Sequence, residues 1–294
     1  WIVVGRGLQP LQQVAAEVSQ RSPDQLEPLR QLETPTEIEP LVDALNRLFE
    51  RLQTAFERER RFLADAAHEL RTPLAAIKAQ AQAALGASDP TQRRGALDNI
   101  VRGVDRAAHL EAQLLTLARL DPEAREALRP VEINLGQLAR EVLSELAPAA
   151  IAKEVELGLE GEENLRAHGD PDLLAILLRN LVDNAIRHTP PAGTVSVQLS
   201  QEKRHTILTV SDTGPGIPAA ERERVFERFY RGQTRNGAGS GLGLSIVRRI
   251  AELHGATVRL RSAASVGLAV DIELHHDGCP LKPQPLALRP VRPG

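Results

Sequence analysis

Gly239-Ser-Gly-Leu-Gly-Leu-Ser245 closes a series of four short polar motifs; the others are His68-Glu-Leu-Arg-Thr-Pro73, Asn180-Leu-Val-Asp-Asn184 and Asp212-Thr-Gly-Pro-Gly216. Each motif is ambiguous by itself. Together they place a histidine on an amphipathic helix, a pair of amides on another helix, and two glycine-rich loops in one chain. One of these loops begins with a carboxylate. The combination and its order guide the interpretation of the remaining sequence.

The composition is that of a folded, helix-rich protein. A length of 294 residues favours two domains, or one domain with helical extensions. The hydrophobic content of 42% supports a core, and the aromatic content of 2% indicates Leu/Ala-rich helices. A net charge of −3 gives no reason to expect nucleic acid as a partner. The single cysteine, Cys279, cannot form an internal disulfide, which fits a reducing cytosol.

The first residues are similar to the inner end of a truncated membrane span. The chain contains no methionine, so we expect a fragment that lacks its natural start. Trp1-Ile-Val-Val4 is too short to cross a bilayer, but an interfacial tryptophan, apolar residues and then Arg6 are typical of the end of a span. A frayed terminus is the alternative.

The next part of the chain is predicted to be helical. A short helix over residues 8–20 and a proline-containing connector precede a long helix that starts at Glu37. Apolar residues recur along the long helix at steps of mostly three and four, as in a coiled coil: Leu41, Leu45, Leu48, Leu52, Leu63, Ala67, Leu70, Leu74, Ile77, Ala81 and Leu85. The eleven-residue step from Leu52 to Leu63 predicts a stutter that locally unwinds the supercoil.

A second long helix follows the turn at residues 86–90 and runs to about Leu120. Its apolar side is predicted to consist of Leu97, Ile100, Val101, Val104, Ala108, Leu114, Leu115 and Leu117. Two long helices joined by a short turn form an antiparallel hairpin, and one hairpin cannot bury both apolar sides. We therefore expect a homodimer in which two hairpins form a four-helix bundle.

The periodicity changes after Asp121-Pro122. Strands are predicted from β-branched content and alternation over residues 131–135, 155–157, 194–199, 205–210, 256–260 and 268–274. Helices are predicted over residues 136–152, 171–188 and 243–254, the second with Asp170 as its N-cap. The fold class is therefore α+β: the helical hairpin, then an α/β sandwich whose mixed sheet is covered by helices on one face.

His68 is a candidate nucleophile. A neutral imidazole reacts near pH 7, and a neighbouring carboxylate can set its tautomer and take its proton. Glu69 is the candidate, although adjacent helical residues do not face each other. Thr72 shares a helix face with His68, and Pro73 removes the donor to the Glu69 carbonyl, which loosens the helix at His68. The alternative is a surface histidine on a charged helix.

Asn180 and Asn184 lie four residues apart and predict a polar edge on an otherwise apolar helix. Amide oxygens suit Mg²⁺, whose other ligands are water and phosphate oxygens. Arg187 is placed to meet a phosphate, and His188 to stack on a base or bond a ribose. The alternative is a pair of solvated surface amides.

The two glycine loops are predicted to contact a nucleotide. Asp212, at a strand end, can accept a hydrogen bond from an exocyclic amine, while Gly214 and Gly216 let the backbone approach a ring. The glycines of 239–243 precede a helix, whose N-terminus can hold phosphates. The stretch 232–239 between them is predicted to be a mobile lid. The spacing is neither that of a Rossmann motif nor that of a P-loop.

These motifs resemble those of bacterial two-component sensor histidine kinases. Residues 62–74 are similar to the phospho-acceptor box of that family. The motifs at 180–184, 212–216, 224–230 and 239–243 resemble its asparagine box, first glycine box, phenylalanine box and second glycine box, in the family's order. Residues 5–58 resemble a HAMP signal-relay module.

The resemblance implies a division of the chain into five parts: the end of a membrane span (1–4), a HAMP-like linker (5–58), a dimerisation and phospho-acceptor domain (59–122), an ATP-binding domain (130–276) and a disordered proline-rich tail (277–294). The whole is then the cytoplasmic portion of an inner-membrane protein, held to the membrane through a missing N-terminal segment.

The resemblance also implies roles for single residues. His68 becomes the phosphohistidine, Glu69 the acid/base, Thr72 a phosphatase residue and Asn184 the Mg²⁺ ligand. The nucleotide contacts that it implies are Asn180, Asn184, Arg187, His188, Asp212, Gly214, Gly216, Phe226, Arg228, Gly239, Ser240, Gly241, Leu242 and Gly243. Ser240 stands where threonine is commoner in the family.

The implied activity is transfer of the γ-phosphoryl group of ATP to His68, and then to an aspartate of a separate response regulator. Two alternatives remain. The first is an ATPase of the gyrase or heat-shock chaperone type, against which the His68 hairpin argues. The second is a non-catalytic signalling scaffold, against which the complete set of motif residues argues.

Overall fold

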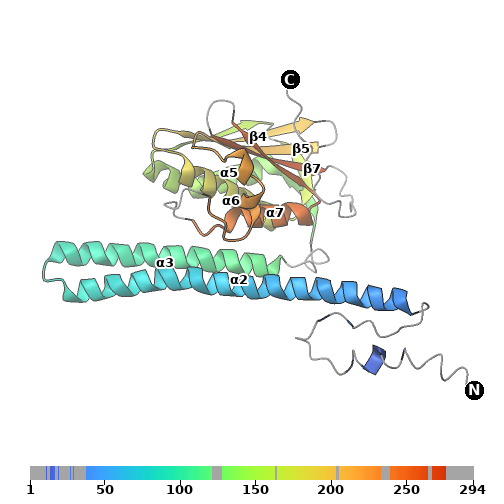
Figure 1. Cartoon of the computed structure of the whole chain (residues 1–294). Helices are drawn as coiled ribbons and strands as arrows, with labels where there is room; N and C mark the ends of the chain where they lie inside the picture. Colours follow the sequence, from blue (N-terminus) through green and yellow to red (C-terminus); the bar gives the residue numbers. More distant parts are fainter. Residues whose placement is uncertain are drawn as a thin grey trace, which may run out of the picture. The chain divides into compact units, whose positions relative to one another are not determined.

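The computed structural model describes residues 11, 14–16, 19, 27, 29, 38–120, 128–162, 164–202, 205–232, 239–263 and 267–275 (Figure 1). The chain divides into two compact units, residues 1–71 and 72–294, and each is described by itself. The predicted span end (1–4) and tail (277–294) lie outside the described residues, as does most of the predicted lid. Within the described ranges, no helix combines the length and apolar character needed to cross a membrane.

The first unit has a small apolar cluster that joins separate stretches of sequence. It is formed by Val14, Leu29, Ile38 and Val42. The backbone N–H of Leu29 donates to Oδ1 of Asn46 at 2.7 Å and ties the connector to the long helix. Residues 11, 14–16 and 19 are helical, in agreement with the predicted short helix, whereas Leu8 and Val18 lie outside the described residues.

Helix α2 spans Glu39–Gly86 and begins two residues later than predicted. Pro73 lies inside it, and the helix continues past the proline. The loss of one backbone donor at Pro73 therefore does not interrupt the helix at His68. Several large apolar side chains of the predicted seam are exposed in the single chain: Leu41, Leu48, Leu52, Leu63, Leu74 and Leu85.

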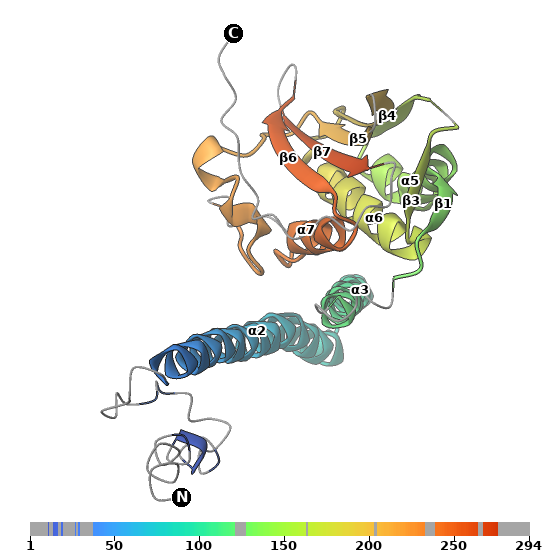
Figure 2. The same cartoon turned by 90° about the vertical axis from the view of Figure 1, so that its right-hand side faces the viewer.

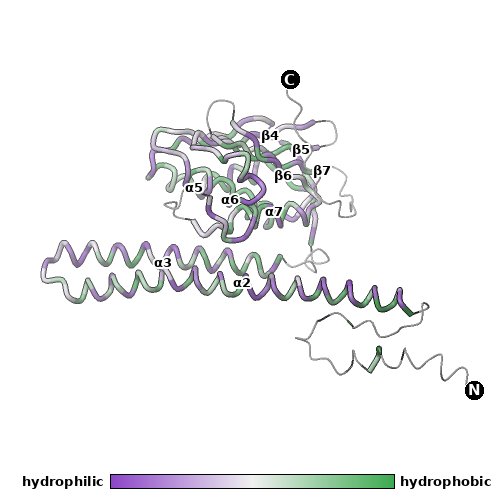
Figure 3. Tube along the Cα trace, viewed as in Figure 1, coloured by the Kyte–Doolittle hydropathy of each residue, from purple (hydrophilic) through white to green (hydrophobic). Residues whose placement is uncertain are grey.

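Helix α3 spans Pro90–Arg119 and begins at the last residue of the predicted turn. Asp89 is its N-cap and accepts the N–H of Thr91 at 3.1 Å. Its buried residues include small and apolar ones at seven-residue intervals: Ala96, Gly103, Leu110 and Leu117. A Cβ atom on Gly103 would lie 2.6 Å from the Ile77 side chain, so the glycine allows close packing. Figure 3 shows hydrophobic and hydrophilic positions alternating along both helices.

The apolar side predicted for α3 remains largely exposed. Four of its members are exposed large hydrophobic residues: Leu97, Val101, Val104 and Leu115. Of the predicted set only Leu117 is fully buried. One stripe of α3 is therefore buried, and a second stripe is uncovered in the single chain.

The main sheet has five strands and is mixed, as predicted. In spatial order they are β2 (Glu156–Gly161), β4 (Thr194–Glu202), β5 (His205–Asp212), β7 (Leu268–His275) and β6 (Thr257–Ser262). The β2–β4 pair is parallel and the other pairs are antiparallel. A separate two-stranded sheet joins β1 (Val131–Asn134) to β3 (Arg166–Gly169).

Three helices cover one face of the main sheet, which confirms the predicted layer arrangement (Figures 1 and 2). They are α5 (Leu135–Ala152), α6 (Pro171–His188) and α7 (Gly243–Leu253). Large side chains from sheet and helices are fully buried between the layers: Leu135, Leu177, Leu178, Leu199, Leu242, Ile246, Ile250 and Ile272. The core lies between the sheet and the helices.

Three elements were not predicted. They are β3 and two 3₁₀ helices, η1 (Ala219–Glu221) and η2 (Arg224–Phe226). Strand β3 is short, and of its residues only Ala167 and Gly169 are buried, so it has little apolar signal. Its conformation depends on pairing with β1, more than 30 positions away.

Candidate nucleotide site and phospho-acceptor

Helix α6 carries the two asparagines. It begins at Pro171 because Oδ1 of Asp170 accepts the N–H groups of Asp172 at 3.1 Å and Leu173 at 3.2 Å. The apolar face predicted for it is buried: Leu174, Leu177, Leu178, Leu181 and Ile186. Asn180 and Asn184 are half-buried. They therefore stand at the edge of the apolar face, as the sequence predicted.

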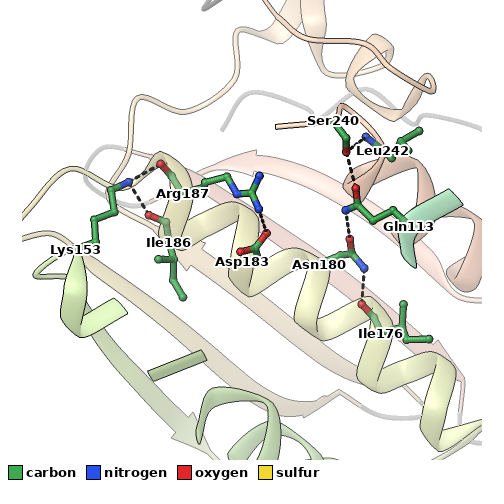
Figure 4. A network of polar contacts seen from close by, with 9 residues as sticks. All are labelled: Gln113, Lys153, Ile176, Asn180, Asp183, Ile186, Arg187, Ser240 and Leu242. Carbon is green, nitrogen blue, oxygen red and sulfur yellow. Dashed lines mark hydrogen bonds and ion pairs between the residues drawn. The ribbon is translucent and has the colours of Figure 1, made fainter. Parts of the chain in front are cut away.

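The C-terminal end of α6 is held by Lys153, which follows α5. Its ammonium group donates to the backbone carbonyl oxygens of Ile186, at 2.9 Å, and Arg187 (Figure 4). The last carbonyls of a helix lack partners within the helix, so a cation satisfies them well. The Arg187 guanidinium pairs with Asp183 at 2.8 Å. Lys153 thereby fixes the backbone of two of the predicted site residues, Arg187 directly and His188 as its neighbour.

His188 and Asp212 influence each other electrostatically. The pKa of His188 is lowered, chiefly because its ring is partly withdrawn from water, while the negative charge of Asp212 acts in the opposite direction. The positive charges of Lys153 and Arg187 lower the pKa of His188 further. The end of α6 and the end of β5 are therefore neighbours, and their membership of one nucleotide site stays a prediction.

Asp212 is the last residue of β5 and is buried, with 7% of its surface exposed. Its Oδ1 accepts the backbone N–H groups of Gly214 at 2.8 Å and Leu268 at 3.3 Å. Burial raises the pKa of the Asp212 carboxyl, and these two hydrogen bonds partly offset that rise. The carboxylate therefore has a structural role besides its predicted role in base recognition.

The glycines after Asp212 are required by the packing of the protein itself. A Cβ atom on Gly214 would lie 2.9 Å from the carbonyl oxygen of His188. Gly216 has a φ of +71°, and its Cβ would lie 3.0 Å from the carbonyl oxygen of Gly267. This steric reason differs from the predicted one, close approach to a ring, which stays a prediction.

The second glycine stretch leads into α7, which begins at Gly243, as expected. The Ser240 hydroxyl oxygen accepts the N–H of Leu242 at 3.2 Å. Gly241 has a φ of +72°, and a Cβ there would lie 2.7 Å from the backbone of Phe229. A Cβ on Gly243 would lie 3.3 Å from Oδ1 of Asn180. The N-terminus of α7 thus lies against Asn180.

The phenylalanine segment is attached to this glycine stretch. The N–H of Phe229 donates to the carbonyl of Gly241 at 3.0 Å. The Arg248 guanidinium lies 5.7 Å from the centre of the Phe226 ring, which links the segment to α7. Arg228 is exposed. Gly239 is half-buried, and residues 233–238 of the predicted lid are outside the described residues.

Gln113 of α3 is a site residue that sequence reasoning missed. Its Nε2 donates to Oδ1 of Asn180 at 3.2 Å, and its Oε1 accepts the hydroxyl proton of Ser240 at 2.6 Å (Figure 4). The only sequence signal is that a polar residue stands among leucines at helical spacing, Leu110, Leu117 and Leu120, and this signal does not identify the partners of Gln113. The contacts of Lys153 with α6 were harder to predict than those of Gln113, since a lysine after a helix is usually solvated.

The predicted phospho-acceptor residues lie on α2. His68 and Thr72 are exposed, and Glu69 is half-buried. His68 and Glu69 belong to the first unit, and the nucleotide motifs belong to the second. The roles of these three residues stay predictions.

Three family models match the chain in succession. They are described as "Sensor protein PhoQ-like, HAMP domain" (residues 8–54), "His Kinase A (phospho-acceptor) domain" (58–123) and "Histidine kinase-, DNA gyrase B-, and HSP90-like ATPase" (169–278). Along its full length the chain is 45% identical to the sensor protein kinase PmrB of Pseudomonas aeruginosa, covering 60% of that protein.

The chain belongs to the two-component sensor histidine kinases. Over 92% of its length this sensor kinase is also 40% identical to the sensor protein QseC of Escherichia coli K12. It spans about 60% of the length of these curated relatives. His68 falls within the phospho-acceptor match, and the asparagine and glycine motifs fall within the ATPase match.

Two solved structures resemble this sensor kinase along most of the chain. The histidine kinase ThkA in complex with the response regulator protein TrrA is 25% identical, with a TM-score of 0.62, covering 83% of this chain and 68% of that one. Full-length ShkA in complex with AMPPNP is 26% identical, with a TM-score of 0.53, covering 73% of this chain and 45% of that one.

Proposed function

We propose that the chain is the cytoplasmic portion of a membrane-anchored sensor kinase, which transfers the γ-phosphoryl group of ATP to His68 and then to an aspartate of a response regulator. One observation carries the proposal. The end of α6 lies beside both the loop after Asp212 and the N-terminus of α7: a Cβ on Gly214 would lie 2.9 Å from the carbonyl oxygen of His188, and a Cβ on Gly243 would lie 3.3 Å from Oδ1 of Asn180.

The residues present fit a nucleotide and a divalent cation. The carboxylate of Asp212 is suited to accept from an exocyclic amine of the base. The N-terminus of α7 is suited to hold phosphates, because its backbone N–H groups and helix dipole favour anions. Asn184 would supply one amide oxygen to Mg²⁺, a cation that prefers oxygen ligands. Bound there, the cation would neutralise charge on the phosphates.

His68 supplies the nucleophile. An imidazole nitrogen forms a bond to the γ-phosphorus, the bond from that phosphorus to the bridging oxygen breaks, and ADP leaves. Glu69 takes the proton that the imidazole loses. The contribution of the protein is mainly positioning and charge stabilisation.

The proposal extends to three partners. A response regulator receives the phosphoryl group, which is supported by the presence of such a regulator in the complex of the related kinase ThkA. A second copy of the chain covers the exposed apolar stripe of the hairpin. A membrane holds the chain through a preceding segment, which is supported by the HAMP match at residues 8–54.

Incubation with γ-labelled ATP and Mg²⁺ tests the proposed reaction. We expect a labelled protein whose phosphate is lost in acid and kept in base. The His68→Gln variant should lose the label while it still binds ATP, and His168→Gln, which changes an exposed histidine on β3, should keep it. ATP hydrolysis without labelled protein would instead favour an ATPase of the gyrase or chaperone type.

A further inference from the structure

Helix α3 contributes a polar residue to a buried position beside the nucleotide motifs. Gln113 has only 8% of its surface exposed, although it ends in an amide. Its neighbours on the same helix face, Leu110, Leu117 and Leu120, are apolar. Burying an amide costs free energy unless both its donor and its acceptor are satisfied. The contacts of Gln113 satisfy both.

The hydrogen bonds of Gln113 use groups that a triphosphate would also need. A phosphate oxygen only accepts hydrogen bonds, and the Ser240 hydroxyl has a single proton, which it donates to Oε1 of Gln113 at 2.6 Å. The N–H of Leu242, at the N-terminus of α7, donates to the oxygen of Ser240. Ser240 therefore cannot donate to a phosphate while it donates to Gln113.

Asn180 is engaged in the same way. Its Nδ2 donates to the carbonyl oxygen of Ile176 at 2.8 Å, which fixes the orientation of the amide. Its Oδ1 is then directed at Nε2 of Gln113, 3.2 Å away (Figure 4). One of the two lone pairs of the Asn180 oxygen, which could otherwise accept from a hydrated cation or from a water on a phosphate, is thus already in use.

We propose that Gln113 is an affinity-determining residue of the nucleotide site, because its amide and the phosphates of ATP compete for Ser240 and Asn180. The inference rests on the proposed function, since it needs ATP to bind at these motifs. The apparent affinity for ATP is then reduced by the fraction of molecules in which Gln113 holds both side chains. Adenosine has no phosphates and does not enter this competition.

The attachment of α3 does not depend on Gln113 alone. Nε of Arg249, on α7, donates to the carbonyl oxygen of Leu120 at 2.7 Å. Leu117 and Leu120 are also buried, at 5% and 2% exposed. Gln113 can therefore be replaced while α3 keeps its other contacts, and alanine or methionine there suits a helix.

The experiment measures the Kd of ATP and of adenosine, each with Mg²⁺, for the full 294-residue chain. Because one hydrogen bond contributes modestly to a net equilibrium, Gln113→Ala and Gln113→Met should bind ATP about two- to tenfold more tightly. Their Kd for adenosine should not change. Gln113→Glu should bind ATP more weakly, since its carboxylate still accepts from Ser240 and repels phosphates.

Two further variants separate the possible failures. Gln80→Ala removes a glutamine whose partner, Asn99, lies within the hairpin, and it should leave both Kd values unchanged. Asn184→Ala should abolish Mg²⁺-dependent ATP binding if the proposed function is correct. Unchanged or weaker ATP binding by Gln113→Ala, or equal tightening for adenosine, would overturn the role of Gln113. Full ATP binding by Asn184→Ala would instead contradict the proposed function.

Discussion

The carboxylate of Asp212 accepts the backbone N–H of Leu268, 56 positions later in the sequence, at 3.3 Å. The same oxygen accepts the N–H of Gly214 at 2.8 Å. This oxygen therefore joins the end of β5 to the start of β7. A residue that the motif assigned to ligand recognition thus also links two adjacent inner strands of the sheet, and we expect mutation to separate the two roles.

Asp212→Asn should separate base recognition from the structural role of the Asp212 side chain. Asparagine keeps an oxygen that accepts the N–H groups of Gly214 and Leu268, so the melting temperature should change little. The charge is lost, and hydrogen bonds to charged groups are the stronger ones, so the ATP affinity should fall about tenfold or more. Nucleotide titration and thermal unfolding measure the two effects. Asp105→Asn, on the exposed side of α3, is the matched control, and equal ATP binding by both variants would contradict base recognition by Asp212.

Gly267 should tolerate no side chain. Its φ is +125°, and a Cβ atom would lie 1.8 Å from the carbonyl oxygen of Asp212. Gly267→Ala should therefore lower the free energy of unfolding by at least about 2 kcal/mol. Gly95→Ala is the opposite case, because Gly95 lies in α3 with no atom within 4 Å of a built Cβ. It should raise the free energy of unfolding by about 1 kcal/mol. Urea unfolding measures the free energy of unfolding of both variants. A change of the same sign in Gly267→Ala and Gly95→Ala would refute the steric argument.

His254 should make stability depend on pH. Its Nε2 accepts the N–H of Asp170 at 3.0 Å, so Nδ1 carries the proton and donates to the carbonyl of Ile250 at 2.8 Å. Burial lowers the pKa of His254 from 6.5, although the Ile250 bond and the charge of Asp170 oppose this. The stabilisation is complete above the unfolded-state pKa of 6.5 and is lost as the pH falls through the folded-state pKa.

Melting temperatures of the native chain and of His254→Gln, measured between pH 8 and pH 5, check this. The native chain should melt higher above about pH 7, and the difference should shrink on acidification. Contributions of other histidines are common to both proteins and cancel in the difference. A difference that grew toward low pH would contradict the neutral, half-buried state of His254.

Leu74→Glu should dissociate the proposed dimer. Leu74 is 57% exposed in the single chain and lies on the predicted seam. A carboxylate there would be desolvated if two hairpins pair. Sedimentation at micromolar concentration should show a dimer for the native chain and a monomer for the variant. Ile151→Glu changes a residue that is 75% exposed on α5 and should leave the dimer intact. A native chain that sediments as a stable monomer would overturn the bundle.

Thr72→Ala should slow dephosphorylation of the regulator more than labelling of His68. The exposed Thr72 hydroxyl lies one turn after His68 and is proposed to orient water against the phospho-aspartate of the regulator. We expect dephosphorylation of the regulator to fall at least about tenfold, with labelling of His68 changed less than about threefold. Thr54→Ala, an exposed threonine on the same helix, should change neither rate. Equal losses in both reactions would leave Thr72 without a separate role.

Local sequence signals predicted much of the fold. Helix α6 was predicted over its full length, because Asp170 and Pro171 define its start and its leucines define one face. The β5 strand end at Asp212 and the α7 start at Gly243 were predicted for similar reasons. The order of elements then followed from the change of periodicity after residue 120.

What the sequence did not reveal depends on partners distant in the chain. Gln113 contacts residues 67 and 127 positions away, and nothing near it in the sequence indicates either contact. Lys153 meets carbonyls 33 and 34 positions away. The steric need for Gly214 likewise arises from the His188 carbonyl, which no motif places beside it.

Helix α6 is fastened at both ends, to Lys153 at one and, through the N–H of Asp170, to His254 at the other. A helix held in this way cannot slide along its axis or turn about it without breaking bonds at one end. The positions of Asn180, Asn184 and Arg187 relative to the sheet are therefore fixed. We therefore expect conformational changes during nucleotide binding and release to occur in the elements that contact α6. The backbone amides of α6 should exchange with deuterium more slowly than those of α3.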